Sequence, residues 1–316
     1  MAYCAGFQPI GVVMRILLLG KDGQVGWQLQ RSLAPHGEVV ACGRAQCDLA
    51  DPDRIRSVVR ELRPDIIVNA AAYTAVDRAE SEPELAHRIN AVAPGVLAEE
   101  AARSGALLLH YSTDYVFDGS KDAPYVEGDP TGPCSVYGRT KQEGEEAVRA
   151  AGGKSVIFRS SWVFGARGEN FVKTILRLAR DRDNLRVVDD QVGSPTPAAM
   201  IATVTGVGLA MLRHGAALER GETRLYHLAA ARPVSWCDFA RTIVGLAGSA
   251  PGFALRLKPE AIAAISSAEY PTAARRPLNS RLDCTRLEND FGLQMPDWQP
   301  YLERMLQLLA LKQNGY

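Results

Sequence analysis

From Arg15 onward, short apolar runs alternate with segments of helical periodicity, and this alternation limits the folds open to the chain. The first apolar run covers residues 16–19, and the first helical pattern covers residues 25–33. A strand, a helix and a second parallel strand form a right-handed crossover, and a series of crossovers builds a parallel sheet with helices on both faces. The sequence therefore predicts an α/β fold with a doubly wound parallel sheet, the Rossmann arrangement. The further alternating segments are residues 39–42, 52–62, 66–69, 85–103, 107–111, 135–149 and 156–158.

The regular alternation ends near Trp162, where a second region begins. Residues 187–197 have a loop-like composition, rich in aspartate and proline, and a strand-like run at 225–228 could extend the sheet. No internal repeat or low-complexity tract separates the regions, so we expect a smaller C-terminal substrate lobe interleaved with the sheet domain. The expected division is residues 14–161 for the Rossmann core, extended by 198–250, residues 162–197 and 251–316 for the substrate lobe, and residues 1–13 for an N-terminal extension.

Charge and cysteine content exclude several classes of partner. Lys and Arg total 36, as do Asp and Glu, so no basic face for nucleic acid or an anionic membrane is indicated. No apolar run approaches the roughly 20 residues that cross a bilayer. The six cysteines show neither the paired spacing of a zinc site nor the density of a disulfide scaffold. We therefore expect a cytoplasmic protein with reduced thiols, no membrane partner and no nucleic-acid partner.

Three glycines, Gly20, Gly23 and Gly26, follow the first strand and open the first helix. Small residues there permit a tight turn and a close approach of the backbone to a pyrophosphate, which then lies over the helix N-terminus. A simple turn would explain the same spacing, but the position directly after the first strand favours a dinucleotide site.

The end of the second strand indicates which dinucleotide binds. An NAD site usually places an acid there to hold the ribose hydroxyls, but this chain has Cys42, Gly43 and Arg44. An arginine suits a 2′-phosphate, so we expect NADPH to be preferred, with NADH possible. The alternative is that Arg44 is an ordinary solvated surface residue.

Tyr137 and Lys141 are four residues apart in a helical segment and so share one helix face. A tyrosine with a pKa of about 10 is a poor acid–base group at neutral pH, and a nearby ammonium favours its ionised form. Thr113 ends the fourth strand, at the edge of the sheet where ligands bind, and its hydroxyl could hydrogen-bond the carbonyl that Tyr137 protonates. Taken alone, the pair could be an exposed surface pair and Thr113 a loop cap.

Seven motifs together resemble the extended short-chain dehydrogenase/reductase family, and the resemblance runs from about Met14 to the end of the chain. They are GKDGQVGW at 20–27, NAAAYTAVD at 69–77, STDYVFDG at 112–119, YGRTK at 137–141, RSSW at 159–162, DQVGSPT at 190–196 and RRPLNS at 275–280.

The resemblance implies an oxidoreductase that reduces the C4 ketone of a dTDP-linked sugar, dTDP-4-dehydro-L-rhamnose, with NADPH. Tyr137 would protonate the ketone oxygen, Thr113 would assist it, and Lys141 would also reach the nicotinamide ribose. Asp48 and Leu49 resemble the pair that flanks the adenine. The residues expected to contact the cofactor are Gly20, Gly23, Gln24, Val25, Gly26, Arg44, Asp48, Leu49, Ala71, Ala72, Tyr73, Thr74, Tyr137 and Lys141, and those expected to contact the substrate are Thr113, Asp114, Trp162, Arg276 and Asn279.

For some of these residues a structural role competes with the implied one. The alanines after the third strand would also suit ordinary helix–sheet packing, and Asn279 would also suit a helix start or an interface. Some relatives use an acid after the glycine loop to share Mg²⁺ across a dimer, but Gln28 stands there, so we expect no metal and either a monomer or a homodimer.

Two other functions remain open within the same resemblance. One is a different nucleotide-sugar enzyme, such as a 4-epimerase or a 4,6-dehydratase. A dehydratase would typically carry a carboxylate pair after the threonine, but Asp114 is followed by Tyr115. The other is a non-catalytic, dinucleotide-binding regulatory subunit of the methionine adenosyltransferase type, which the intact Tyr137, Lys141 and Thr113 disfavour.

Overall fold

The computed structural model describes residues 14–214 and 218–313, and the expected N-terminal extension, residues 1–13, lies outside them. Its centre is a six-stranded sheet in which every neighbouring pair is parallel, as predicted. The strand order is β2 (Glu38–Cys42), β1 (Arg15–Leu19), β3 (Ile66–Asn69), β4 (Leu107–Thr113), β5 (Lys154–Ser160) and β10 (Thr223–His227). Chain order reverses beside β1, which makes the gap between β1 and β3 the place where such sheets bind ligands.

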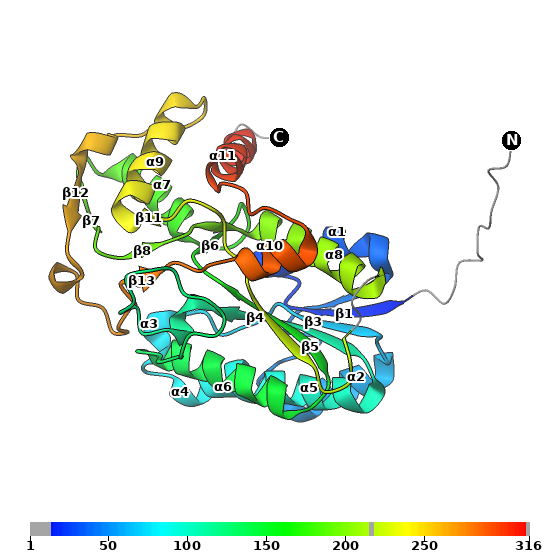
Figure 1. Ribbon diagram of the computed structural model, residues 1–316. Coiled ribbons are helices and arrows are strands. Elements are labelled where there is room, and N and C mark those ends of the chain that lie inside the picture. Colours follow the sequence, from blue (N-terminus) through cyan, green and yellow to red (C-terminus); the bar gives the residue numbers. More distant parts are fainter. Residues whose placement is uncertain (1–13, 215–217, 314–316) are drawn as a thin grey trace, which may run out of the picture.

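Helices cover both faces of this sheet (Figure 1). The face with α1 (Gln24–Leu33) and α8 (Ala198–His214) buries Leu29 and Met200 in one apolar cluster. The opposite face carries α2 (Pro52–Leu62), α5 (Ala93–Ser104) and α6 (Val136–Ala150), which bury Ile55, Leu97 and Val148 in a second cluster. These two apolar layers explain why the strands read as continuous hydrophobic runs.

The helical pattern predicted at residues 85–103 is interrupted rather than uniform. After the short α3 (Val76–Ala79), the chain forms α4 (Pro83–His87), a π-helical segment at Arg88–Val92, and then α5. Pro94 lies in the first turn of α5 and has no N–H to donate to the preceding turn, which accounts for the wider π turn before it.

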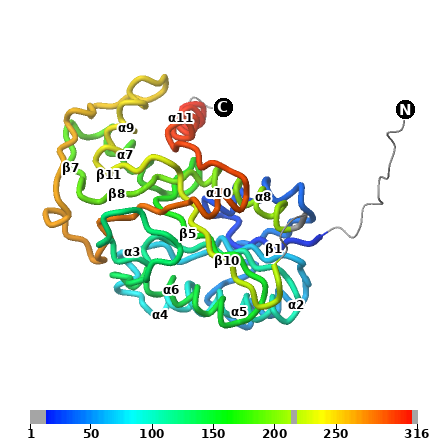
Figure 2. Tube along the Cα trace, viewed as in Figure 1, coloured from blue at the N-terminus to red at the C-terminus, as the bar shows by residue number. Residues whose placement is uncertain are grey.

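The second lobe stands beyond the carboxyl ends of the strands, at the upper left of Figure 2. It contains α7 (Phe171–Asp181), α9 (Trp236–Ser249) and α11 (Gln299–Gln313), with α10 (Thr285–Phe291) between the lobes. Its small sheets pair β7 (Leu185–Val188) with β12 (Ile262–Ile265), β6 (Val163–Phe164) with β9 (Thr196–Pro197), and β8 (Val192–Gly193) with β11 (Val234–Ser235) and β13 (Asn279–Ser280).

One part of the expected division needs correction. β10 and α8 do extend the Rossmann core, but α9 packs against α7, β7 and β12 instead of the main sheet. We therefore propose the division that the sequence indicated, with residues 236–249 moved to the substrate lobe.

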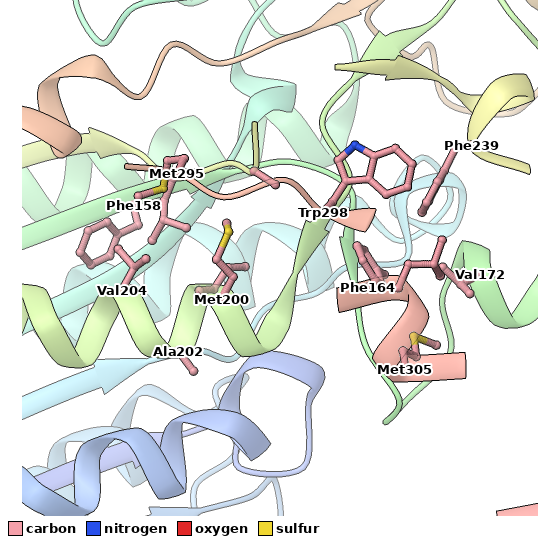
Figure 3. Packing of buried hydrophobic residues seen from close by; sticks show 14 of the residues in the cluster. Phe158, Phe164, Val172, Met200, Ala202, Val204, Phe239, Met295, Trp298 and Met305 are labelled. Atoms are coloured by element: carbon pink, nitrogen blue, oxygen red, sulfur yellow. The ribbon is translucent and has the colours of Figure 1, made fainter. Parts of the chain in front are cut away.

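A continuous apolar cluster joins the two lobes (Figure 3). Phe158 of β5 and Val204 of α8 lie at one end of it, and Phe239 and Trp298 of the second lobe lie at the other. The Trp298 ring meets Phe239 edge to face at 5.1 Å, and its N–H donates to the Arg232 carbonyl at 2.8 Å. This close packing holds the substrate lobe against the sheet domain. In the part of the chain that the structure describes, no helix has the length and apolarity needed to span a membrane.

Candidate active site

A cavity of about 1570 Å³ lies between the lobes, at the carboxyl ends of the central strands. It brings together nearly every residue that the sequence singled out. The predicted residues that line it are Gly20, Gly23, Gln24, Val25, Arg44, Asp48, Leu49, Ala71, Ala72, Tyr73, Thr74, Thr113, Asp114, Tyr137, Lys141, Trp162 and Arg276. Gly26 and Asn279 are the two predicted residues that are not among the lining residues.

The glycine loop has the geometry of a phosphate cradle. Gly20 has φ +81°, in the left-handed region, and a Cβ on it would lie 2.7 Å from the Ala71 nitrogen. A Cβ on Gly26 would overlap the Gly20 carbonyl oxygen, so Gly26 supports the turn from behind instead of facing the cavity. Gly23 is the N-cap residue of α1 and has no side chain that could accept a hydrogen bond. The first N–H groups of the helix are therefore left for an anion. These residues fit the pyrophosphate of a dinucleotide.

Contacts from the second lobe hold this loop, and none of them was predicted from the sequence. The Asn170 amide donates to Gln24 Oε1 at 2.9 Å, and Gln24 Nε2 donates to the Val163 carbonyl at 3.4 Å. Arg167 lies over the exposed Trp27 ring at 4.0 Å. Because the partners are almost 150 residues apart in the chain, only the folded structure reveals them.

Arg44 lies at the cavity rim directly after β2, with its side chain 77% exposed. It pairs with Asp48 at 3.2 Å, and the Ala50 N–H together with Arg44 lowers the pKa of Asp48. Asp22 also approaches this corner, because its carboxylate fills the space that a Cβ on Gly43 would need. The exposed Arg44 guanidinium is thus available to a 2′-phosphate, although Asp22, an acid that the sequence analysis did not single out, lies nearby.

The loop after β3 is held by Asn90, a residue of the π-helical segment that the sequence did not single out. Its side chain accepts from the Tyr73 N–H at 2.9 Å and donates to the Tyr73 carbonyl at 3.0 Å. This pair of bonds fixes the small residues Ala71 and Ala72 against the cavity.

Tyr137 and Lys141 occupy the first two turns of α6, which Ser135 caps by accepting from the Gly138 N–H at 3.1 Å. Two glycines let this helix pack closely against its neighbours. A Cβ on Gly138 would overlap the Tyr115 carbonyl in the turn after β4, and one on Gly144 would overlap the Asn90 carbonyl in the π-helical segment. Both functional side chains are consequently buried against the end of β4.

The Tyr137 hydroxyl is poised as an acid. Burial raises the pKa of Tyr137 to about 12. The Asp114 carboxylate also raises this pKa, and the hydrogen bond with Thr113 lowers it. Thr113 itself donates to Asp114 Oδ1 at 2.9 Å. We expected Lys141 to tune the tyrosine directly, but in this structure Lys141 donates to the Tyr111 carbonyl at 2.6 Å and contacts His110 at 3.3 Å. Burial lowers the pKa of Lys141 to about 8, while Glu145 acts in the opposite direction.

Asp114 is a buried acceptor with spare capacity. Burial raises the pKa of this carboxyl to about 6, although the nearby Ser280 and Thr113 hydroxyls lower it. Its Oδ2 atom has no hydrogen-bond partner among the residues that the structure describes. A ligand hydroxyl would satisfy this oxygen.

The second lobe supplies an aromatic wall and a cation. Trp162 has φ +47°, an unusual value for a residue other than glycine, and its ring stacks on Trp236 at 3.5 Å. Gly193 makes room for that ring, because a Cβ there would lie 2.6 Å from it. Arg276 pairs with Asp77 at 2.7 Å, and its buried Nη1 atom has no partner within the described residues. The arginine thus keeps a donor for an anionic ligand.

Asn279 does not take the substrate-contacting position that we expected. Its side-chain amide donates to the Lys121 carbonyl at 2.6 Å and the Ala123 carbonyl at 2.9 Å, and its oxygen accepts from the Arg281 N–H at 3.0 Å. With its hydrogen-bonding groups engaged in this way, Asn279 joins two segments of the protein. The interface role that competed with substrate binding is the one that the geometry supports.

The described residues contain no group of three or more His, Cys, Asp or Glu side chains that could hold a metal ion. The absence of a bridging metal therefore stays a prediction, which rests on Gln28 at the position of the acid in some relatives.

The fold and the site define the class of protein. A parallel sheet with a glycine-rich first turn, and a buried Tyr-x-x-x-Lys pair beside a threonine at the end of β4, form the arrangement that the sequence predicted for a member of the extended short-chain dehydrogenase/reductase family.

Comparison with known proteins narrows the class. The sequence matches the family described as RmlD substrate binding domain over residues 14–311. The dTDP-4-dehydrorhamnose reductase of Escherichia coli K12 is 46% identical over 302 residues, covering 93% of this chain and 97% of that protein. That of Burkholderia thailandensis is also 46% identical, covering 90% and 96%. The chain therefore belongs to the RmlD family, that of the dTDP-4-dehydrorhamnose reductases.

Solved structures agree. The crystal structure of the dTDP-4-dehydrorhamnose reductase from Bacillus anthracis in complex with NADP has a TM-score of 0.83 and 34% identity, covering 94% of this chain and 100% of that one. The Clostridium acetobutylicum enzyme gives 0.84 and 35%, covering 94% and 99%. The dTDP-glucose 4,6-dehydratase DesIV from Streptomyces venezuelae shares the fold with a TM-score of 0.78 at 18% identity.

Proposed function

We propose that this chain uses NADPH to reduce the C4 ketone of dTDP-4-dehydro-L-rhamnose to dTDP-L-rhamnose, the last step of dTDP-rhamnose synthesis. The observation that carries the proposal is the buried Tyr137 hydroxyl, which hydrogen-bonds Thr113 at the end of β4 inside a cavity large enough for a dinucleotide and a nucleotide sugar.

The glycine loop would hold the pyrophosphate, Arg44 the 2′-phosphate, and Lys141 the nicotinamide ribose. Bound NADPH supplies a hydride to the carbonyl carbon. Tyr137 gives its proton to the ketone oxygen. Thr113 would turn the one hydroxyl proton that it donates to Asp114 in the structure towards the same oxygen, so that the developing alkoxide would meet two hydroxyl donors. A Tyr137 pKa of about 12 keeps the proton on the phenol until charge develops on the ketone.

The sugar would lie between β4 and the second lobe. The unpartnered Asp114 Oδ2 would accept from a sugar hydroxyl, and the Trp162 ring, fixed by Trp236, would form a wall against the apolar face of the pyranose. Arg276 would place its free N–H on the diphosphate. We keep the cytoplasm as the proposed location, and a monomer or homodimer as the proposed assembly.

The test is incubation of the purified protein with NADPH and dTDP-4-dehydro-L-rhamnose, followed by stereochemical analysis of the sugar. The reductase consumes one NADPH per sugar and yields the L-rhamnose configuration. A 4-epimerase would change the sugar without net loss of NADPH, and a regulatory subunit would bind NADPH and leave the sugar intact. Either of these results would overturn the proposal.

A further inference from the structure

Behind the Tyr137–Lys141 pair, Lys141 continues into a buried polar chain through two residues, His110 and Asn69, that the reaction described above does not use. His110 of β4 has no exposed surface, and Asn69 of β3 and Lys141 are each 1% exposed. The Asn69 amide nitrogen lies 3.2 Å from His110 Nδ1, and Lys141 Nζ lies 3.3 Å from His110 Nε2. Asn69 and His110 are register partners on adjacent strands, so the sheet itself sets their contact.

The orientation of Asn69 determines the tautomer of His110. Asn69 Oδ1 accepts from the Ala71 N–H at 3.3 Å, which directs the amide nitrogen to His110. If the oxygen and nitrogen of the Asn69 amide were exchanged, its NH₂ group would face the Ala71 N–H, and two donors would oppose each other. Because the amide nitrogen only donates, His110 Nδ1 must accept, and the proton of the neutral imidazole then sits on Nε2.

This tautomer places an N–H in front of Lys141 Nζ. Lys141 already donates to the Tyr111 carbonyl at 2.6 Å. An ammonium has only donors and would face the Nε2–H group unfavourably, whereas an amine has one lone pair that accepts from it. We propose that Asn69 and His110 are positioning residues that fix the Nε2–H tautomer and thereby favour the amine form of Lys141. The inference rests on the proposed reductase function, because it concerns the lysine of that site.

The other charges around Lys141 do not account for this bias. On α6, Glu145 lies one turn away, and its carboxylate raises the lysine pKa while being bound by Arg159 of β5 and by Arg149. Tyr137 lies one turn before Lys141 on the same helix and keeps its proton, and Asp114, directly after β4, acts on Tyr137. Burial lowers the pKa of Lys141, and burial together with the lysine charge holds the pKa of His110 well below its usual value. His110 is therefore the neutral ring that the hydrogen-bond argument requires.

The consequence concerns the pH dependence of the reaction. Because the amine that accepts from His110 is stabilised, Lys141 loses its proton at a lower pH than burial alone would set. An ammonium donates through three N–H groups and an amine through two, so the number that Lys141 can offer to the Tyr111 carbonyl and the nicotinamide ribose falls as the pH rises through this value. The kcat–pH profile should therefore contain a limb that reports the charge of Lys141.

The direct test is the tautomer of His110 by long-range ¹H–¹⁵N correlation NMR on the ¹⁵N-histidine-labelled full chain, a readout that needs no turnover. The wild type should show His110 neutral with its proton on Nε2. A proton on Nδ1, or a charged ring near pH 7, would overturn the proposal. His110→Gln assigns the signal, because the His110 resonances disappear from the spectrum of that variant. If this variant does not fold, His227→Gln removes the resonances of the other fully buried histidine of the described residues, and His110 is assigned by elimination.

Asn69→Asp supplies the matched perturbation. A carboxylate accepts from Nδ1–H, so the tautomer should reverse, Nε2 should accept from an ammonium, and the lysine limb of the kcat–pH profile should move up by about one pH unit. Part of that shift would come from the new charge itself, which Asn69→Asp/His110→Gln retains. A smaller shift in the double variant supports transmission through His110, and an equal shift contradicts it. If the wild type lacked turnover, the proposed function would fail while the tautomer result still stood.

Discussion

At the scale of single residues, the burial of Tyr137 explains both its stability as an acid and its value to the reaction. Tyr137→Phe removes the proton donor while keeping the ring that meets Tyr115 edge to face at 5.5 Å. We expect kcat to fall by about 10²- to 10⁴-fold with NADPH affinity nearly unchanged. Steady-state kinetics and a fluorescence titration with NADPH measure the two quantities.

Tyr226→Phe is the matched control, because it also deletes a buried tyrosine hydroxyl, one that donates to Asp290 at 2.8 Å away from the cavity. It should cost about 1 kcal/mol of stability and leave kcat unchanged. Equal losses of kcat in both variants would show that Tyr137 acts through packing alone.

Asp114 should lower the stability of the ligand-free protein near neutral pH. Its folded pKa of about 6 exceeds the unfolded value of about 3.9, so the folded state binds its proton more tightly. The favourable contribution is complete below about pH 4 and is lost as the pH rises through 6. Asp114→Asn should therefore increase the free energy of unfolding at pH 7 by about 2 kcal/mol while weakening turnover. A variant less stable than wild type at pH 7 in urea unfolding would contradict this account.

The residues that the sequence could locate are those tied to a strand end or a helix start, such as Gly20, Thr113 and Tyr137. Asn90 and Trp236 escaped notice, because their partners Tyr73 and Trp162 become neighbours only through tertiary packing. Asn279 was predicted to bind substrate because it lies in one of the seven motifs, but its amide hydrogen-bonds to the 121–123 segment. His110 was not singled out, although it is a polar residue inside the predicted strand at 107–111.

At the scale of elements, close packing of the first turn decides whether the cofactor site forms. Gly26→Ala places a Cβ onto the Gly20 carbonyl, so the loop must move away from α1. We expect NADPH affinity to drop at least about tenfold, since backbone N–H groups would no longer converge on the pyrophosphate. Gly128→Ala, where a Cβ meets nothing within 4 Å, is the control. Unchanged affinity in Gly26→Ala by isothermal titration would be incompatible with the cradle described above.

The placement of α6 depends on a buried ion pair. Glu145 binds Arg159 of β5 through two hydrogen bonds of 2.8 and 2.7 Å, with both side chains almost fully buried. Glu145→Gln leaves the arginine charge without its counter-charge, and we expect a loss of about 3–5 kcal/mol in the free energy of unfolding. The exposed Glu146→Gln on the same helix should change it by less than about 0.5 kcal/mol.

The pH dependence of this pair has a definite sign. Although burial raises the pKa of Glu145, its bonds to Arg159 prevail and hold the pKa below its usual value. The stabilisation is therefore present above about pH 4.3 and is lost as the pH falls through the lower folded value. The stability difference between wild type and Glu145→Gln should shrink in acid. A difference that stayed constant down to pH 3 would rule out the charge as its source.

Elements were predictable where periodicity was strong, as in β1, β4 and α6. The break between α4 and α5 was not, because only Pro94 marks it, and a proline inside a helical pattern can also kink a helix without ending it. The assignment of α9 was wrong for a related reason. Its apolar face is as suited to β7 and β12 as to the main sheet, and the sequence contains no signal that distinguishes these two surfaces.

At the scale of the whole molecule, the two lobes complete one another. The sheet domain supplies the glycine loop, Thr113 and the Tyr137–Lys141 pair, and the second lobe supplies Trp162 and its support. The apolar cluster through Phe158 and Trp298 packs the two lobes against each other, so the site is built across a shared core. The fold class could be inferred from the alternation of elements, whereas the substrate came from a resemblance that spans the chain and that the RmlD family match supports.

The most direct test of the central claim follows the hydride itself. NADPH carrying deuterium at the transferable C4 position of the nicotinamide is incubated with the protein and dTDP-4-dehydro-L-rhamnose, and the sugar is analysed by mass spectrometry and NMR. The account predicts dTDP-L-rhamnose with one deuterium at C4 of the sugar, formed at a rate that Tyr137→Phe lowers by about 10²- to 10⁴-fold. A product without deuterium at C4, or no product while NADPH binds normally, would contradict it.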